Sequence, residues 1–181
     1  AARIGQAFAF IFVITGLVNA NYILLLVGVF IYIAAASEEQ SAAFRSFASR
    51  LKVKDAMEAS PVTLSASAPL SQAIETLLAS PQREFPVLDG SRLVGLLDRN
   101  AMLAGLRDLG AEAAIGNAMA EVQPCSPEEP LVDAYTRMRN SGAAAAVVVG
   151  PSGQVVGLLT QENVAEMMMI DSARPGWRFQ R

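Results

Sequence analysis

The side chains of this chain that could do chemistry are few, and their types exclude several reaction classes. The 181 residues contain no histidine and one cysteine, Cys125. Within this sequence, catalysis by a histidine base and most zinc sites are therefore excluded, and no histidine can activate the Cys125 thiol. One cysteine cannot form an intramolecular disulfide. We expect no catalytic residue and no metal ligand here, and we expect Cys125 to be a small buried residue.

The remaining candidates follow two copies of one apolar tetrapeptide. Val-Gly-Leu-Leu occurs at Val94–Leu97 and again at Val156–Leu159, 62 residues later. The first copy continues into Asp98, and the second continues into Thr160 with Asn163 three residues beyond. These side chains accept hydrogen bonds from backbone N–H groups, so each position suits the N-terminal cap of a helix. The same groups could hold a ligand, and the residues alone leave both roles open.

Other short matches share the register of the tetrapeptide. Ala56-Met57 recurs as Ala118-Met119, 62 residues later, and Pro69-Leu70 recurs as Pro130-Leu131, 61 residues later. Short matches arise by chance, but several in one register indicate a duplicated supersecondary unit. The two copies fill residues 53–170.

Each copy has the hydrophobic pattern of strands alternating with helices. The first copy is predicted to contain a strand at 62–64, a helix capped by Ser67, strands at 85–88 and 93–97, and a helix at 99–106. The second copy is predicted to contain a helix starting at Ser126-Pro127, strands at 144–149 and 155–159, and a helix reaching Met169.

A strand–helix–strand–strand–helix unit that is present twice and ends in Val-Gly-Leu-Leu-Thr-x-x-Asn resembles a pair of CBS domains. The resemblance implies an α/β (α+β) fold with CBS domains at 53–108 and 115–170. It also implies a pseudo-symmetric disc that dimerises and binds an adenosine nucleotide in clefts between the units.

In that family the cleft is marked by Gly-h-h-Thr/Ser-x-x-Asp/Asn, where h is apolar. Gly157, Thr160 and Asn163 match it, and the resemblance implies that they bind the nucleotide while main-chain groups near Cys125 border its base. The first copy departs from the pattern, with Asp98 at the hydroxyl position and Ala101 at the amide position. Because a carboxylate repels phosphate, we expect the first copy to be empty.

The N-terminal segment is apolar throughout. Residues 4–37 contain no charged side chain. A single helix of this length would be about 51 Å long, whereas the hydrocarbon core of a bilayer is about 30 Å thick. We therefore expect a transmembrane helical hairpin within residues 1–37, with spans at 3–18 and 22–36 and a break at Asn19-Ala20-Asn21. A signal peptide does not fit the length or the second span.

Charge predicts the orientation of this hairpin. Arg45, Arg50 and Lys52 lie in or beside a basic linker at 38–52, which the positive-inside rule places in the cytoplasm. The predicted location is the cell (inner) membrane, as a multi-pass protein with the duplicated unit cytoplasmic and a tail at 171–181. The net charge of −3 gives no electrostatic reason to expect nucleic-acid binding.

The apolar segment carries a second resemblance. Ile4-Gly5-Gln6-Ala7, Gly28-Val29-Phe30-Ile31 and Ala34–Glu38 resemble the last two membrane helices of site-2 protease family intramembrane zinc metalloproteases, some of which continue into a CBS pair. This implies that the chain is the C-terminal part of a longer hydrolase that cleaves membrane-associated substrates. The zinc ligands and the His-Glu-x-x-His motif would lie upstream. Membrane lipid, missing upstream transmembrane helices, a membrane-protein substrate and a second copy are the implied partners.

Two alternatives stay open on sequence grounds. The chain could be the regulatory CBS tail of an ion transporter or channel, or a free-standing CBS sensor on a membrane anchor. A His-Glu-x-x-His motif upstream would distinguish the protease from both.

Overall fold

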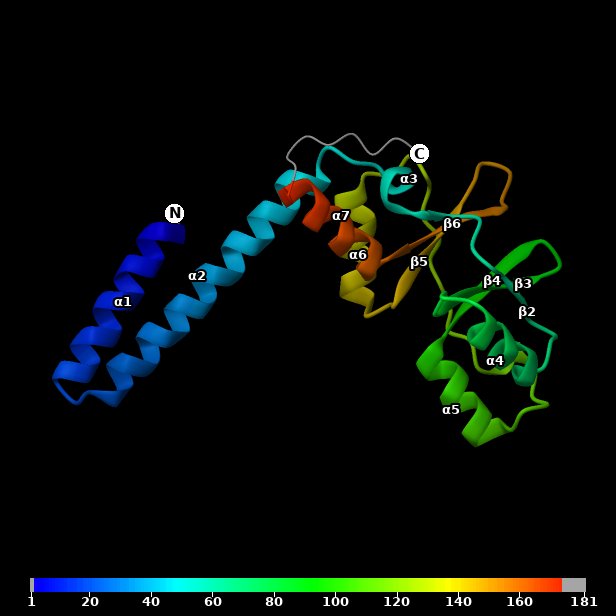
Figure 1. Cartoon of the computed structure of the whole chain (residues 1–181), viewed down its shortest axis with the longest axis horizontal. Helices are drawn as coiled ribbons and strands as arrows, with labels where there is room; N and C mark the ends of the chain where they lie inside the picture. Colours follow the sequence, from blue (N-terminus) through cyan, green and yellow to red (C-terminus); the bar gives the residue numbers. More distant parts are fainter. Residues whose placement is uncertain (1, 174–181) are drawn as a thin grey trace. The chain divides into compact units, whose positions relative to one another are not determined.

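The computed structural model describes residues 2–173, and for residues 2–4 and 36–43 it describes the backbone alone. The chain forms two units, the first ending at Ala48 and the second starting at Ser49 (Figure 1). Each unit is described by itself.

The first unit is a pair of helices that pack along each other. Helix α1 (Ala2–Val18) and helix α2 (Tyr22–Ala48) are joined by a turn at residues 19–21, where the side chain of Asn21 accepts a hydrogen bond from Leu24 N at 3.1 Å. A Cβ added at Gly28 would lie 2.9 Å from Ala9 O, so glycine lets the two backbones approach closely. The predicted break is therefore at the predicted place, but α2 continues through most of the predicted 38–52 linker.

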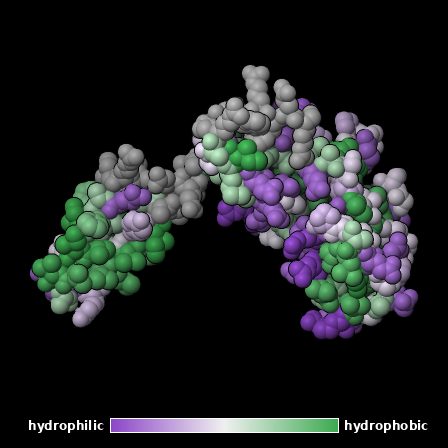
Figure 2. Space-filling view, viewed as in Figure 1, coloured by the Kyte–Doolittle hydropathy of each residue, from purple (hydrophilic) through white to green (hydrophobic). Residues whose placement is uncertain are grey.

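Apolar side chains are exposed along both helices of this unit (Figure 2). Phe10, Leu17, Ile23 and Phe30 each expose about two thirds or more of their surface. Among the residues that the structure describes, however, no helix combines the length and the apolar character that crossing a membrane requires. The two predicted helices are present, but their predicted role as transmembrane spans is not supported.

The second unit contains two three-stranded sheets flanked by helices. Its elements are α3 (Val53–Ala56), β1 (Glu58–Ala59), β2 (Leu64–Ser65), α4 (Leu70–Ala79), β3 (Glu84–Asp89), β4 (Arg92–Asp98), α5 (Arg99–Leu109), η1 (Ile115–Asn117), α6 (Leu131–Ser141), β5 (Ala145–Val149), β6 (Val155–Thr160) and α7 (Gln161–Ala173). One sheet has the order β2-β3-β4 and the other β1-β6-β5. The tandem α+β fold predicted for 53–170 is confirmed. Of the predicted tail, residues 174–181 lie outside the described residues.

The beginnings of the two repeats are exchanged. We call residues 53–59 and 115–120 the leading segments of the first and second repeat. Strand β1, in the first leading segment, pairs antiparallel with β6 of the second repeat. In return, Ala120 of the second leading segment forms a bridge with Leu96 of β4, with hydrogen bonds of 2.9 Å in both directions. The sheet β1-β6-β5 therefore contains strands from both repeats, and the sheet β2-β3-β4 is bridged by the second repeat at Ala120.

The repeated tetrapeptides meet the repeated Ala-Met pairs at these junctions. A Cβ added at Gly95 would lie 2.6 Å from the Met119 sulfur and 2.7 Å from Ala120 O. A Cβ at Gly157 would collide with the Met57 sulfur and would lie 3.0 Å from Glu58 O. Glycine at both positions is thus what allows the leading segments to pack on β4 and β6.

Two helices begin later than the sequence predicts. Helix α4 starts at Leu70 rather than after Ser67, and α6 starts at Leu131 rather than after Ser126. The first N–H group of each helix is satisfied by a neighbouring segment, because Leu70 N donates to Ala113 O at 2.9 Å and Leu131 N donates to Leu51 O at 3.0 Å. Tertiary partners replace the predicted serine caps.

Candidate functional site

Thr160 and Asn163 line a pocket of about 240 Å³ that both repeats build. The second repeat contributes the end of β6 and the start of α7. The first repeat contributes Glu58 of its leading segment and the loop before β3. The pocket is lined by Glu58, Pro81, Gln82, Arg83, Glu84, Leu158, Thr160, Glu162, Asn163 and Glu166.

The two polar side chains that match the family motif also bind each other. The Thr160 hydroxyl donates to Asn163 Oδ1 at 2.6 Å and accepts from Asn163 N at 3.1 Å, while Thr160 N donates to Asn163 Oδ1 at 3.2 Å. This reciprocal arrangement has the form of a capping box at the start of α7. Thr160 and Asn163 therefore cap helix α7 and also line a pocket, so the structure is compatible with both a capping role and a binding role.

Gln82 fixes the wall of this pocket that comes from the first repeat. Its side chain is buried, accepts from Val62 N at 2.8 Å, and donates to Val62 O and Glu84 O, both at 2.8 Å. Because a buried amide needs partners, these three bonds hold the loop before β3 against the segment before β2.

The charge at this pocket is predominantly negative. Glu58, Glu84, Glu162 and Glu166 line it, and Arg83 is the only cation among the lining residues. Burial raises the pKa of the half-buried Glu84 carboxyl, and the nearby Asp98, Glu162 and Glu58 carboxylates raise it further, whereas Arg83 lowers it. An anionic ligand meets net repulsion here unless its charge extends into solvent.

A larger pocket of about 470 Å³ lies at the corresponding place beside the first repeat's motif. Asp98, at the end of β4, occupies the position that Thr160 occupies at the end of β6. The lining residues are Leu96, Asp98, Ala120, Glu121, Val122, Gln123, Ala134, Arg137, Met138, Ser141, Gly142 and Ala143 to Ala146. We call this pocket the Asp98 cavity. The expectation that the first copy is empty therefore concerns the larger of these two pockets.

Asp98 caps helix α5, as its type and position predict. Its Oδ1 accepts a hydrogen bond from Ala101 N at 2.8 Å. Arg137, the only basic residue lining the cavity, donates to Glu129 Oε1 at 2.6 Å and to Glu129 Oε2 at 3.1 Å. This fork-to-fork pair neutralises the guanidinium charge locally.

Gly157 and Cys125 do not line the pocket of Thr160. Gly157 lies under Met57 and Glu58, where it admits the leading segment. Cys125 is 4% exposed and forms a bridge with Val148 of β5. Val148 pairs with Gly157, which precedes Thr160 by three residues on β6. Burial raises the pKa of its thiol to about 11. The structure therefore separates Cys125 from Thr160 and Asn163.

The acidic wall and the Asp98 cavity were not found by sequence reasoning. The loop before β3 lines the Thr160 pocket although it precedes Thr160 by more than 70 positions. The segment after the second leading segment lines the Asp98 cavity although it follows Asp98 by more than 20 positions. The 62-residue register matches Glu58, which lines the Thr160 pocket, with Ala120, which lines the Asp98 cavity. The repeat therefore predicts that the two pockets have equivalent walls, but only once the exchange of leading segments is known.

Metal ligation finds no support within residues 2–173. Among the side chains that the structure describes there, which leave out those of 36–43, no group of three His, Cys, Asp or Glu is placed to hold a metal ion.

Comparison with known families and structures identifies what this unit is similar to. The CBS domain profile matches residues 53–108 and 115–170. A zinc metalloprotease of Methanocaldococcus jannaschii is 24% identical over 171 residues, which cover 94% of this chain and 48% of the relative. The zinc metalloprotease Rip3 of Mycobacterium tuberculosis is 29% identical over 181 residues, which cover 93% of this chain and 46% of the relative. The chain spans about half the length of these relatives.

Solved structures with the same fold include several with adenosine compounds. CBSX2 in complex with AMP has a TM-score of 0.58 and 23% identity, covering 67% of this chain and 98% of that chain. The CBS domain of a bacterial CNNM/CorC family Mg²⁺ transporter in complex with ATP has a TM-score of 0.63 and 17% identity, covering 74% and 97%. The CBS domain pair of protein MJ0100 in complex with 5′-methylthioadenosine and S-adenosyl-L-methionine has a TM-score of 0.61 and 21% identity, covering 67% and 98%. At these identities the likeness establishes the fold.

Proposed function

The chain belongs to the CBS domain family, and we propose that it is the membrane-attached regulatory part of a site-2-type zinc metalloprotease. The observation that carries this proposal is the extent of the match to the two zinc metalloproteases. Each match covers at least 93% of this chain, so each includes residues of both the helical hairpin and the CBS pair, in the same order. A CBS tail attached to an unrelated transporter would share only the second part.

Attachment to the membrane is supported by the surface of the hairpin. Large exposed apolar side chains such as Phe10, Leu17 and Phe30 are costly in water and are stabilised by lipid or by further apolar helices. In this proposal the hairpin contacts both lipid and the membrane helices of the protease domain. The CBS pair then lies in the cytoplasm, and a second copy of it is the proposed dimer partner.

The zinc chemistry belongs to another part of the protein. This chain has no histidine, and its described residues do not fit a metal site. Its contribution is regulatory: a ligand that binds one arrangement of the CBS pair more tightly than another shifts the population toward that arrangement. Access of a membrane-associated substrate to the protease domain would follow that population.

The first experiment examines the protease assignment. The gene that encodes this chain should also encode a His-Glu-x-x-His motif upstream of Ala1. Its full product should cleave a single-pass membrane substrate in proteoliposomes, and replacing the motif glutamate by glutamine should abolish cleavage. Absence of the motif contradicts the proposal, and ion flux through the same proteoliposomes would favour the transporter alternative.

The second experiment examines the ligand site. We propose that Thr160 and Asn163 take part in binding an adenosine-containing ligand in the pocket of about 240 Å³. The informative variant is Thr160→Asp, because Asp98 already shows that aspartate caps the equivalent helix. The variant should keep the melting temperature while weakening AMP binding about tenfold, measured by calorimetry. If the parent chain and Thr160→Asp bind AMP with equal affinity, Thr160 only caps helix α7 and takes no part in binding.

A further inference from the structure

The chain that enters the second unit from the hairpin is bound by the second repeat, although the first repeat follows the hairpin in sequence. We call residues 51–54 the entry segment and residues 126–131 the clamp. We propose that the clamp, together with helix α6 behind it, controls the entry segment, so that a conformational change of the CBS pair reaches the hairpin through the second repeat. This rests on the proposed regulatory role of the CBS pair and goes beyond it by naming the repeat and the residues that transmit the change.

Backbone hydrogen bonds join the entry segment to the clamp. Lys52 and Pro130 form an antiparallel bridge between them. Because Leu131 is the first residue of α6, one of the bonds ties the entry segment directly to the start of that helix. The three bonds, each 3.0 Å long, run from Leu131 N to Leu51 O, from Val53 N to Glu129 O and from Lys54 N to Pro127 O. A shift of α6 must therefore move the entry segment or break these bonds.

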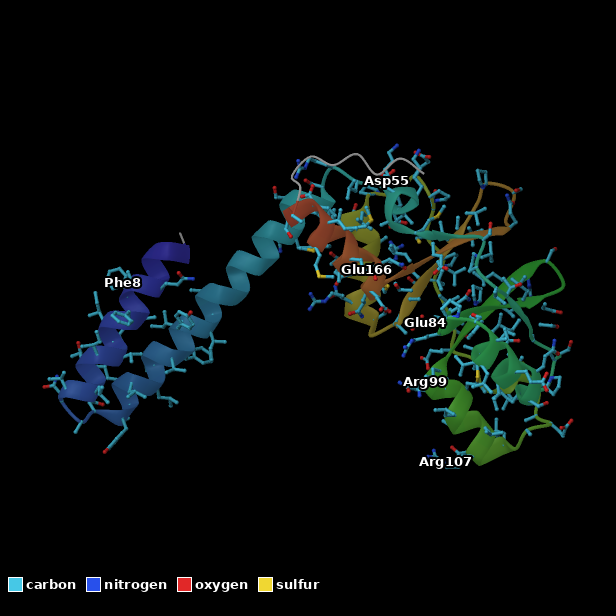
Figure 3. All side chains as sticks on the ribbon, viewed as in Figure 1. Phe8, Asp55, Glu84, Arg99, Arg107 and Glu166 are labelled. Atoms are coloured by element: carbon cyan, nitrogen blue, oxygen red, sulfur yellow. The ribbon has the colours of Figure 1, made fainter. Side chains whose placement is uncertain are left out.

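Helix α3, which continues the entry segment, also packs on the second repeat. Its first residue, Val53, is fully buried, and the helix contacts α6, α7 and β6. Asp55 of α3 accepts a hydrogen bond from Lys52 N at 2.8 Å and so fixes the start of the helix (Figure 3). The entry segment is therefore held to the second repeat both by hydrogen bonds and by the packing of the helix that follows it.

The chain passes to the first repeat only beyond Ser60. Ser60 N donates to Val156 O of β6 at 3.2 Å. Two residues later, Val62 is bonded through both its N–H and its C=O group to the side chain of Gln82, in the first repeat. Ser60 has a positive φ of 54°, which is uncommon for a residue with a Cβ and places a turn between these two contacts. Residues 51–60 thus belong structurally to the second repeat.

Charged side chains reinforce the clamp. The Glu128 carboxylate accepts from Lys52 Nζ and from Lys54 Nζ, both at 2.7 Å. These hydrogen bonds lower the pKa of Glu128 to about 2, so the carboxylate stays charged at physiological pH. Because the three side chains are about half exposed, the backbone bonds contribute more than the ion pairs. Glu129 connects the clamp to α6, since its backbone O accepts from the entry segment while its carboxylate binds Arg137 through both oxygens.

The first repeat holds the connection between the repeats in the same way but without charges. Pro69 and Ala114 form an antiparallel bridge, and Leu70 N donates to Ala113 O at 2.9 Å. In the register of the duplication, these positions match the clamp and the entry segment. The charged residues Lys52, Lys54, Glu128, Glu129 and Arg137 are matched by Ala114, Gly116, Ser67, Ala68 and Thr76. Charge is thus added to the clamp that holds the chain arriving from the hairpin.

Two alanines at matched positions make the proposal testable. Ala134 of α6 and Ala73 of α4 are both buried and occupy equivalent positions of the repeat. Ala134→Gly weakens α6, and Ala73→Gly weakens α4 to a similar degree, because glycine lowers the stability of a helix in which it replaces alanine. Hydrogen exchange of individual amides is measured for each variant of the full chain in detergent micelles, and thermal melting identifies any variant that unfolds globally.

The two variants should have different effects on the entry segment. We expect Ala134→Gly to accelerate exchange of the Val53 and Lys54 amides about fivefold, because both amides donate to the clamp in front of α6. Ala73→Gly should leave these two amides unchanged. It should instead accelerate exchange of the Ile115 amide, which donates to the first repeat.

Glu128→Gln tests the charges at the surface, where a substitution does not disturb the core. Exchange of the Lys54 amide should rise about twofold, and about 0.5 M NaCl should have the same effect on the parent chain but little effect on the variant. Glu112→Gln, at an exposed position of the connection between the repeats, is the matched control and should leave the Lys54 amide unchanged. Salt that acts equally on the parent chain and on Glu128→Gln would contradict the role assigned to the charges.

Two results would overturn the inference. Unchanged exchange of Val53 and Lys54 in Ala134→Gly would show that α6 does not control the entry segment. Equal acceleration of these amides by Ala73→Gly would show that the first repeat controls the entry segment as well. The exchange experiment needs neither a ligand nor proteolysis, so its failure would leave the protease assignment standing. A missing His-Glu-x-x-His motif would refute the protease assignment and leave the clamp intact.

Discussion

Glu84 and Asp98 lie directly opposite each other on β3 and β4, yet each lines a different pocket. Glu84 belongs to the wall of the Thr160 pocket, and Asp98 lies at the edge of the larger cavity. The equivalent pair in the other sheet is Ala145 and Thr160, which also divides between the two pockets. The ends of these two strand pairs therefore separate the pockets. The Asp98 carboxylate at one pocket still raises the pKa of Glu84 at the other.

Replacing Glu84 by glutamine should stabilise the fold at neutral pH. Like charges opposite each other destabilise a strand pair by about 0.2–1 kcal/mol, and Glu84 is half-exposed, so the gain should lie within that range. The pKa of Glu84 is raised in the fold, so the folded state holds its proton more tightly than the unfolded chain does. Its ionisation therefore costs stability above the folded pKa, and this cost vanishes below the unfolded value of 4.5.

Urea denaturation of Glu84→Gln and the parent chain at pH 4 and pH 7 measures this difference. The gain should be present at pH 7 and should shrink at pH 4. Glu75→Gln, at an exposed position of α4, is the matched control and should change little at either pH. A gain that is independent of pH would show that ionisation of Glu84 is not its origin.

Gly157→Ala should destabilise the second unit by about 1–3 kcal/mol, because the added methyl group collides with Met57. Met57→Ala removes the colliding side chain and loses its own packing. The double variant should therefore be more stable than the sum of the two single changes, and denaturation of all four proteins gives the coupling. Strict additivity would mean that the two residues do not meet.

Gln82→Ala should cost about 1–3 kcal/mol, because it removes the three hydrogen bonds of a buried side chain, two of them to the backbone of Val62 and one to Glu84 O. It should also loosen the wall of the Thr160 pocket, so hydrogen exchange around Val62 should accelerate. Gln161→Ala, at an exposed position on α7, controls for loss of a glutamine as such. Similar exchange at Val62 in both variants would contradict the role assigned to Gln82.

Cys125 should be inert toward iodoacetamide in the folded chain. Its thiol is 4% exposed and its pKa is raised to about 11, so at pH 8 about 0.1% is thiolate. Urea should release fast labelling, which mass spectrometry follows at a single site because the chain has one cysteine. As a control, Ala79→Cys in a Cys125→Ala background should label quickly when folded. Fast labelling of native Cys125 would show that this region opens readily.

The repeat could be predicted from sequence because duplication leaves matched residues in one register. Val94–Leu97 and Val156–Leu159 form β4 and β6 as continuous apolar runs do when both faces are covered. Asp98 caps α5 because a cap depends on residues close in sequence. Local rules failed at α4 and α6, where backbone partners far along the chain took the place of Ser67 and Ser126.

The pockets could not be predicted, because their walls come from both repeats. No sequence pattern around Glu58 or Gln82 predicts that they line the same pocket as Thr160. Glu58 reaches that pocket because β1 pairs with β6, whose residues lie about a hundred positions further along the chain. The membrane role of the hairpin was predicted from the uncharged run at 4–37, and the structure supports the helices without supporting a span.

The exchange of leading segments has a consequence for breaking the chain. A protease cut in the exposed connection at Gly110–Glu112 would give two pieces. The first would carry β1, which pairs with β6 of the second, and the second would carry Ala120, which forms a bridge with Leu96 of the first. Neither piece could complete its own sheet, but the two could reassemble as a complementing pair. Two intact chains could exchange their leading segments in the same way. Domain swapping of these segments is therefore a route by which the duplicated unit can form dimers.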